Sequence, residues 1–440
     1  MNRLFSLIFF LVCTTTLSGQ VLTLPEAINI ALRNSLDIQL VKNNLQISNL
    51  NNSAGIAGGL PVVTATGSDN EQSVDINQNL SQKISGRDSS YHIQRKGAVS
   101  NQLSAGVGGN LLLYNGLRVV ATRQRLAELE KQSREYVASQ IQTVIAGVMT
   151  SYYDVVRQQG YIKTIDQSID VARQKLEIIK AQQNVGLANN ADLFQAQLDL
   201  NNLLQTKQSQ LLVIEQSKTS LLSLLTLRPD SSVAISDTII VDRSVVLGNV
   251  LDSLHSSPDF LAAAGQVRIN QIIEKETAAQ RYPTVRVSAG YNYTRNQATA
   301  GQILLNQLNG PFAGFNFIIP IYNGSVYKRQ QQIAGVNTRN AGLQEKMLLR
   351  DNQANAVRTY QAYTSALLQL ETAQKNVVLA RQLLDLVLQR FQYRQNTIVE
   401  VTIAEQSFET AAYSLINLSY AAKAAEVELN RLTGRLSPLQ

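Results

Sequence analysis

Apolar residues recur about every 3.5 positions through two long stretches that contain no proline. These stretches are residues 116–185 and 324–393, and they are equal in length. In the first, the apolar stripe takes twelve steps from Val137 to Ile179. Such a period is typical of a coiled-coil seam rather than of one face of a globular helix. At ~1.5 Å per residue each helix would be about 105 Å long, which no single globular domain can contain.

Four shorter helical segments match the long ones in summed length. In each half of the chain, two of them together are about as long as one long stretch, so two short helices laid end to end would cover one long helix. Without such a cover, half of each long apolar stripe would be exposed to water. The predicted short helices are residues 24–57, 191–227, 246–281 and 398–433.

Each half also carries two segments in which apolar and polar residues alternate, as they do in strands. Each has, or can be extended to, the ~9–11 residues with which a tilted strand crosses a bilayer. Four strands with an apolar face have open edges, which lipid does not tolerate, and are too few to close a barrel. The strands of several chains must therefore be pooled, unless they form a small soluble sheet packed on helices. The segments are residues 62–66, 99–113, 285–293 and 313–321.

The two halves are homologous. "LRNSLDI" at 32–38 matches "LHSSPDF" at 254–260, and "ADL" at 191–193 matches "VEV" at 399–401. The second pair of matching segments is closer together in the sequence than the first pair, because the first half has more residues between its two strands. This extra length predicts a surface loop around residues 83–97. We expect two repeats, residues 20–228 and 246–435, with a linker at 229–245 and a tail at 436–440.

The sequence Tyr-Asn-Gly occurs at the end of a strand in both repeats. Tyrosine is favoured at a bilayer interface, asparagine can cap a helix, and glycine allows a sharp turn. The motif therefore predicts a junction between membrane strand and helix. Its two copies are Tyr114, Asn115 and Gly116, and Tyr322, Asn323 and Gly324.

The N-terminus has the features of a secretory signal peptide, which we place at residues 1–19. Arg3 precedes a short apolar run and then small residues. Cys13 is the only cysteine; it is removed with the signal or, alternatively, acylated. The apolar run is too short to span a bilayer, and no other run suggests a transmembrane helix.

Charge and motif content exclude several functions. The net charge of +7 comes from scattered residues and no Lys/Arg block tracks phosphate, so we expect no nucleic-acid partner. The two histidines, His92 and His255, have no metal-ligand spacing. No nucleophile or phosphate-loop motif is present. We expect no catalytic residues, no metal and no cofactor.

The order helix–strand–strand–long helix–helix, repeated twice, resembles that of TolC-like outer-membrane efflux proteins. Tyr-Asn-Gly after a strand, "NVGLANNADL" at 184–193 and "TIVEV" at 397–401 carry the resemblance. It implies a mainly helical fold with membrane β strands, in which long coiled-coil helices form an α-barrel and each chain contributes four strands. The implied assembly is a homotrimer with a 12-stranded β-barrel in outer-membrane lipid and a tunnel through the periplasm.

The resemblance also implies partners and a gate. A periplasmic adaptor (membrane fusion) protein docks on the helix-hairpin tips, and an inner-membrane pump of RND, ABC or MFS type supplies energy for efflux or type I secretion. Asp192 and Glu400 match gate acids, and both also suit a helix N-terminus. Phe391 and Asn396 stand where well-known members have a gate tyrosine and arginine, so the latch does not transfer. Implied adaptor contacts are Gly186, Leu187, Ala188, Gln395, Thr397 and Ile398.

The alternative function is a periplasmic coiled-coil adaptor or scaffold. Such a protein usually has one long hairpin and compact β domains rather than a tandem repeat with lipid-facing strands. The exported cargo is not encoded in these patterns.

Overall fold

The computed structural model describes residues 21–84 and 87–437. The predicted signal peptide with Cys13, and the end of the predicted tail, lie outside the described residues. The chain divides into two compact units, and each draws on both sequence repeats. One contains described residues within 45–133 and 263–345, with all the described strands. The other contains residues 21–44, 134–262 and 346–437.

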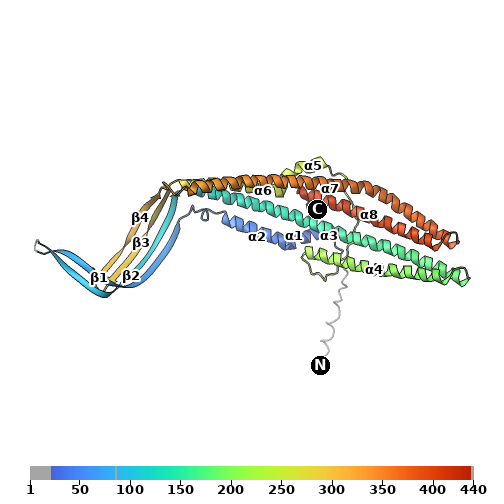
Figure 1. The fold of residues 1–440 in the computed structure, drawn as a ribbon, viewed down its shortest axis with the longest axis horizontal. Helices are drawn as coiled ribbons and strands as arrows, with labels where there is room; N and C mark the ends of the chain where they lie inside the picture. The colour runs from blue at the N-terminus through green and yellow to red at the C-terminus, as the bar shows by residue number, and fades with distance from the viewer. Residues whose placement is uncertain (1–20, 85–86, 438–440) are drawn as a thin grey trace, which may run out of the picture. The chain divides into compact units, whose positions relative to one another are not determined.

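The two long helices are equal in length, as the apolar stripes predict. α3 runs over Arg118–Asn184 and α7 over Val326–Gln392, 67 residues each (Figure 1). The stripe of α3 is buried over much of its course, for example at Val148, Tyr152 and Ile179. None of the helices in the described part of the chain has an apolar stretch able to span a membrane.

Two of the four predicted short helices are broken. Residues 24–57 form α1 (Leu24–Asn34) and α2 (Leu36–Asn51). Residues 246–281 form α5 (Leu247–Ser253) and α6 (Pro258–Ala278), with short 3-10 turns at Leu254–Ser256 and Ala279–Arg281. The other two helices are continuous, α4 over Asn190–Leu224 and α8 over Ile398–Leu432.

A buried serine marks both breaks. Ser35 Oγ accepts the N–H of Ile38, and Ser257 Oγ accepts the N–H of Phe260, both at 3.4 Å. A serine that caps the following helix in this way competes with continuation of the preceding one. Ser35 and Ser257 occupy equivalent positions in the matching segments "LRNSLDI" and "LHSSPDF", so the break is a property of the repeat.

The four strands form one antiparallel sheet in the order β1-β2-β3-β4. They are β1 (Val62–Ile84), β2 (Arg87–Tyr114), β3 (Thr284–Ala298) and β4 (Leu305–Ile318). The predicted surface loop at residues 83–97 is wrong, because strand pairing continues to Ile84 and Arg87 and the extra residues lengthen a β hairpin (Figure 1). The last predicted strand ends at Ile318 rather than at residue 321.

Strand register brings the predicted apolar positions onto one face of the sheet. Leu111 pairs with Val287, which pairs with Phe315. Phe315 and Phe317 leave 76% and 70% of their surface exposed. The opposite face of the sheet is mostly polar or glycine, with Phe312 lying against Gly108 and Gly290 and with Leu308 beside Thr294. Its other positions include Thr64, Gly106, Ser288 and Asn292. An exposed apolar face opposite a polar one is the pattern of strands in a membrane barrel.

Left-handed backbone conformations recur at equivalent positions of the two repeats. Gly116 and Gly324 have φ of +70° and +67°. Gly186 at +75° corresponds to Arg394 at +59°. Further pairs are Leu117 with Ser325 and Thr226 with Gly434. The duplication thus preserves the turns at the ends of the helices even where the residue types have diverged.

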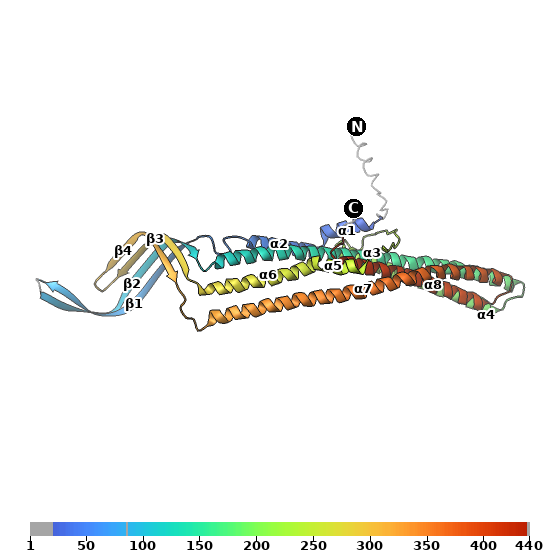
Figure 2. The same ribbon diagram turned by 90° about the horizontal axis from the view of Figure 1, so that it is seen from above.

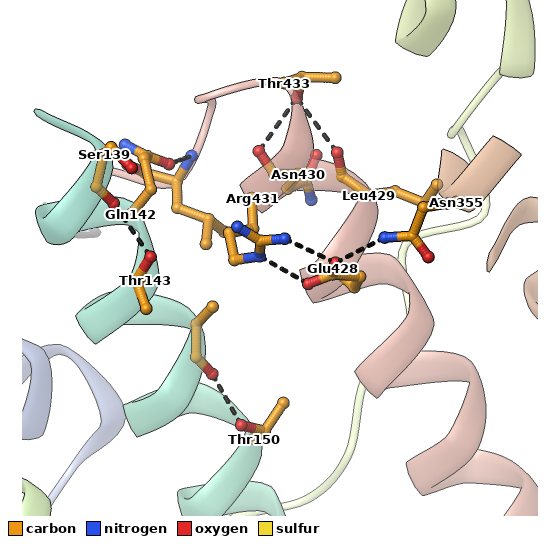
Figure 3. A network of polar contacts seen from close by, with 12 residues as sticks. Ser139, Gln142, Thr143, Thr150, Asn355, Glu428, Leu429, Asn430, Arg431 and Thr433 are labelled. Atoms are coloured by element: carbon orange, nitrogen blue, oxygen red, sulfur yellow. Dashed lines mark hydrogen bonds and ion pairs between the residues drawn. The ribbon is translucent and has the colours of Figure 1, made fainter. Parts of the chain in front are cut away.

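In the unit without strands, the end of α8 is held by polar contacts (Figure 3). Arg431 donates two hydrogen bonds to Glu428, at 2.7 and 2.8 Å, and Asn355 of α7 donates to the same carboxylate. Beyond α8, the side-chain amide of Gln142 pairs with the backbone of Leu436 in both directions at 2.9 Å. These bonds fix the chain between the last helix and α3.

Candidate functional site: the helix-hairpin tips

The first tip joins α3 to α4. Gly186 adopts the left-handed conformation that the sequence predicts for it. The side chain of Asn189 then caps α4 by accepting the N–H of Asp192 at 2.8 Å. Asp192 is therefore held in the first turn of α4, where a carboxylate is favoured by the helix dipole.

The second tip joins α7 to α8 and has the same geometry. Thr397 and Glu400 form a capping box, in which the Thr397 N–H donates to the Glu400 carboxylate at 2.6 Å. The hydrogen bonds from Thr397 hold the pKa of Glu400 below its ordinary value of 4.5. Glu400 thus combines a helix-capping role with an exposed negative charge.

Arg394 is a residue that the sequence reasoning missed. It occupies the left-handed position of the second tip, where the first tip has Gly186. A non-glycine residue there is strained, and such strain concentrates at functional sites. The signal was available, because alignment of the two repeats places Arg394 opposite Gly186.

A cleft of about 330 Å³ lies between the two tips. It brings together predicted gate residues from both hairpins, because Asp192 of the first lines the same cleft as Asn396 of the second. The cleft also contains Arg394, so it holds side chains of both charges. The side-chain oxygen Oδ1 of Asn396 is buried and accepts no hydrogen bond. The cleft is further lined by Ile179, Gln182, Leu187, Ala188, Phe391, Thr397 and Ile398.

Phe391 lies at the inner wall of this cleft with most of its ring in the apolar core of the tips. Only 6% of its surface is exposed. It packs in a cluster with Ile179 of α3 and Phe408 of α8, among other apolar side chains. The side-chain amide of Gln182 donates to the Phe391 carbonyl at 3.4 Å. Glu400, by contrast, does not line the cleft. Gln395 does not line the cleft either, and its side chain is exposed.

Figure 2 shows the two hairpins, α3–α4 and α7–α8, side by side at their tips. A buried charge links them. Lys175 of α3 has a fully buried side chain and lies 3.0 Å from Asp199 of α4 and 3.2 Å from Glu405 of α8. Nothing in the apolar stripes indicated this cluster, because its members are single charged residues on three different helices.

The Tyr-Asn-Gly junctions differ in their surroundings. Asn115 accepts the N–H of Val119 at 3.3 Å, as expected of a helix cap. At Asn323 the backbone carbonyl, rather than the side chain, accepts the N–H of Val326. Tyr114 and Tyr322 are both exposed, by 41% and 83%. Within the described residues, no group of three or more His, Cys, Asp or Glu side chains is placed to hold a metal ion.

Comparison with known proteins agrees with this architecture. The family model for outer membrane efflux proteins matches residues 27–227 and 250–435. The fold is similar to that of VceC of Vibrio cholerae, an outer membrane protein, with a TM-score of 0.76 at 17% identity over 93% of this chain and 96% of that one. It is also similar to the Campylobacter jejuni CmeC outer membrane channel, with a TM-score of 0.76 at 15% identity over 94% and 85% of the two chains. No curated protein matches the sequence.

The chain therefore belongs to the outer membrane efflux protein family. It is an exit duct of an efflux system, located in the outer membrane and extending into the periplasm. The alternative of a periplasmic adaptor or scaffold is not supported by this membership.

Proposed function

We propose that three copies of this chain form a passive conduit, with twelve strands in the outer membrane and the long helices around a periplasmic tunnel. One observation carries the proposal. The described strands form a single four-stranded sheet with an exposed apolar face, and β1 and β4 are open edges. In lipid each unpaired backbone group costs several kcal/mol, so β1 of one copy must pair with β4 of the next.

The exposed apolar residues of the helices fit the same assembly. α4 exposes Phe194 and Leu198, and α7 exposes Leu379 and Leu386, with 52% to 62% of each residue accessible in the single chain. These side chains lie outside the apolar core of the tips. Packing of one copy against the next would remove them from water, as coiled-coil seams require.

The tips are the proposed docking surface for a periplasmic adaptor, with Gly186, Leu187, Ala188, Gln395, Thr397 and Ile398 as contacts. Leu187 is 49% exposed, although apolar. An inner-membrane pump of RND, ABC or MFS type would supply the energy and select the cargo, whether in efflux or in type I secretion. The duct itself would need no catalytic group.

The gate would lie at the same tips. Three copies of Glu400 around one axis form an acidic ring that attracts cations and repels anions. Asp192 and Arg394 line one cleft and supply opposite charges there, so Arg394 takes the place of the basic residue that is absent at Asn396. Phe391 supports the cleft from the core side rather than from the lumen.

Ion selectivity in planar bilayers tests the gate. Glu400→Gln should reduce the preference for cations in a salt gradient, since glutamine keeps the capping geometry and removes the charge. Glu371→Gln is the control, because this exposed acid on α7 pairs with Lys375 in the middle of the helix. Unchanged selectivity in Glu400→Gln would refute the acidic ring, and equal changes in both variants would indicate a general charge effect.

A further inference from the structure

The β1–β2 hairpin continues well beyond the other two strands. Leu305, the first residue of β4, pairs with Gln297, and the register through Asn101 brings it level with Glu71 of β1. β1 has 23 residues and β4 has 14, so β4 of a neighbouring copy would leave at least nine residues of β1 without a partner. Residues 62–71 suffice to cross the bilayer, so the extension lies outside it.

A β-bulge separates this extension, which we call the outer ribbon (residues 76–84 and 87–95), from the sheet. Val74 pairs with Ala98, and the next pair is Ile76 with Arg95. β1 advances by two residues and β2 by three, so β2 carries the extra residue. Gly97, with φ of +64°, donates its N–H to the Asp75 carboxylate at 2.7 Å and fixes the bulge.

Beyond the bulge, the apolar side chains of the ribbon lie on the other face, and the bulge accounts for the change in β2. Below it, the even-numbered residues of β1 share the polar, glycine-rich face with Thr64, Gly106 and Gly108. β1 has no extra residue, so Ile76 and Leu80 continue on that same face, with Gln78 between them. The bulge brings the odd-numbered residues of β2 there too, namely Tyr91, Ile93 and Arg95.

The opposite face of the outer ribbon is polar. Asn79 pairs with His92 in the register, and the two side chains are joined by a hydrogen bond of 2.6 Å between Asn79 Oδ1 and His92 Nδ1. Asn77, Ser81, Ser90 and Gln94 also lie on this face. In the sheet the apolar side faces lipid, whereas in the ribbon the apolar side is continuous with the polar face that would line the pore.

The ribbon's apolar face is uncovered in the single chain. Tyr91 is 49% exposed, and Ile76, Leu80 and Ile93 are partly exposed. An isolated two-stranded ribbon is marginally stable in water, so this face needs a cover. Lipid does not supply it, because the ribbon lies beyond the part of β1 that crosses the bilayer and its apolar residues continue the face that would line the pore. Within one chain the β3–β4 connection reaches only the Ile76 end of this face, since a Cβ on Gly301 would lie 4.0 Å from Ile76 Cδ1. The assembly brings the equivalent ribbons of neighbouring copies to the same side.

We infer that the outer ribbons of three copies pack their Ile76, Leu80, Tyr91 and Ile93 faces against one another above the barrel and narrow its external mouth. The inference rests on the proposed trimer. Thr299 of the β3–β4 connection supports the base, since Val99 donates to its Oγ1 and accepts from its N–H, both at 2.9 Å. The apolar face of each ribbon is thus covered by another copy of this chain. Arg95, which pairs with Ile76 on the same face, contributes positive charge at the narrowed mouth.

Single-cysteine cross-linking tests the inference. Cys13 is the only native cysteine, and it lies in the predicted signal peptide. Leu80→Cys and Tyr91→Cys place a thiol on the inward face, whereas Asn79→Cys and His92→Cys place one on the outward face of the same ribbon. Oxidation and a short bifunctional maleimide, applied to the full-length exported protein, are followed by a non-reducing gel.

We expect covalent dimers from Leu80→Cys and Tyr91→Cys and none from Asn79→Cys, His92→Cys or the unsubstituted protein. Maleimide labelling of intact cells should reach the two outward positions. If the trimer persists on a native gel but the inward cysteines do not cross-link, or the outward ones cross-link equally, the packed mouth is wrong. A protein that is monomeric on the native gel would instead overturn the proposed assembly and, with it, this inference.

Discussion

The ammonium group of Lys175 lies 3.2 Å from the carboxylate of Glu405. The lysine side chain has no exposed surface, and that of Glu405 is only 8% exposed. Since Asp199 is a second partner at 3.0 Å, one buried cation joins helices α3, α4 and α8 close to the tips. Within the described part of the chain neither acid forms an ion pair with another cation, so both depend on this lysine.

Lys175→Met should destabilise the protein by about 3–5 kcal/mol, because removing one partner leaves a buried charge uncompensated. The measurement is the denaturant or thermal midpoint of the detergent-solubilised protein. Lys180→Met is the matched control on the same helix, since its pair with Glu177 is 50% and 71% exposed and such pairs are worth at most ~1 kcal/mol. Equal losses in the two variants would contradict the role assigned to Lys175.

The pH dependence of stability should carry a signature of Glu405. Burial raises the pKa of Glu405 above 4.5, while Lys175 opposes this shift. An acid with a raised folded-state pKa holds its proton more tightly when folded, so its charged form costs stability above that pKa and the cost is relieved as the pH falls through it. As the pH falls, the free energy of unfolding of the wild type should therefore rise relative to that of Glu405→Gln. A wild type that loses stability relative to this variant on acidification would show the opposite sign.

Glu400 should respond to pH in the reverse sense. Its pKa is lowered by the Thr397 hydrogen bonds, so its contribution to the first turn of α8 is present above the ordinary value of 4.5 and is lost as the pH falls through the lowered pKa. Hydrogen exchange of the tip amides, corrected for intrinsic rates, reports this loss. Thr397→Ala removes the box at all pH values, at a cost of about 1 kcal/mol, and its tip should show no such transition.

The two junction glycines should differ in tolerance. A Cβ at Gly116 would lie 2.5 Å from the Tyr282 Cβ, whereas a Cβ at Gly324 would meet nothing within 4 Å. Both residues are left-handed, so alanine costs ~1–2 kcal/mol at either site from backbone strain alone. Gly116→Ala should therefore lower the thermal midpoint more than Gly324→Ala. Equal midpoints would show that Tyr282 moves aside without cost.

Much of this architecture could be predicted from the sequence, because the extended apolar stripes and the duplicated Tyr-Asn-Gly motif are patterns that can be read from local stretches of the chain. The helix break at Ser35 was missed, since a serine inside a helical stretch shows its capping role only through the hydrogen bond to Ile38. The length of β1 was missed because apolar residues within 76–84 recur only at every fourth position, at Ile76, Leu80 and Ile84, rather than in strict alternation. The cluster around Lys175 depends on tertiary packing of three helices, which no single stretch of sequence reveals.

The central claim is that the chain cannot complete its sheet alone and shares it with two further copies. The most direct measurement is the mass of the detergent-solubilised exported protein by light scattering or native mass spectrometry, with the detergent contribution removed. The account predicts three chains per particle. A stable particle of one chain, with β1 and β4 left as free edges, would contradict it.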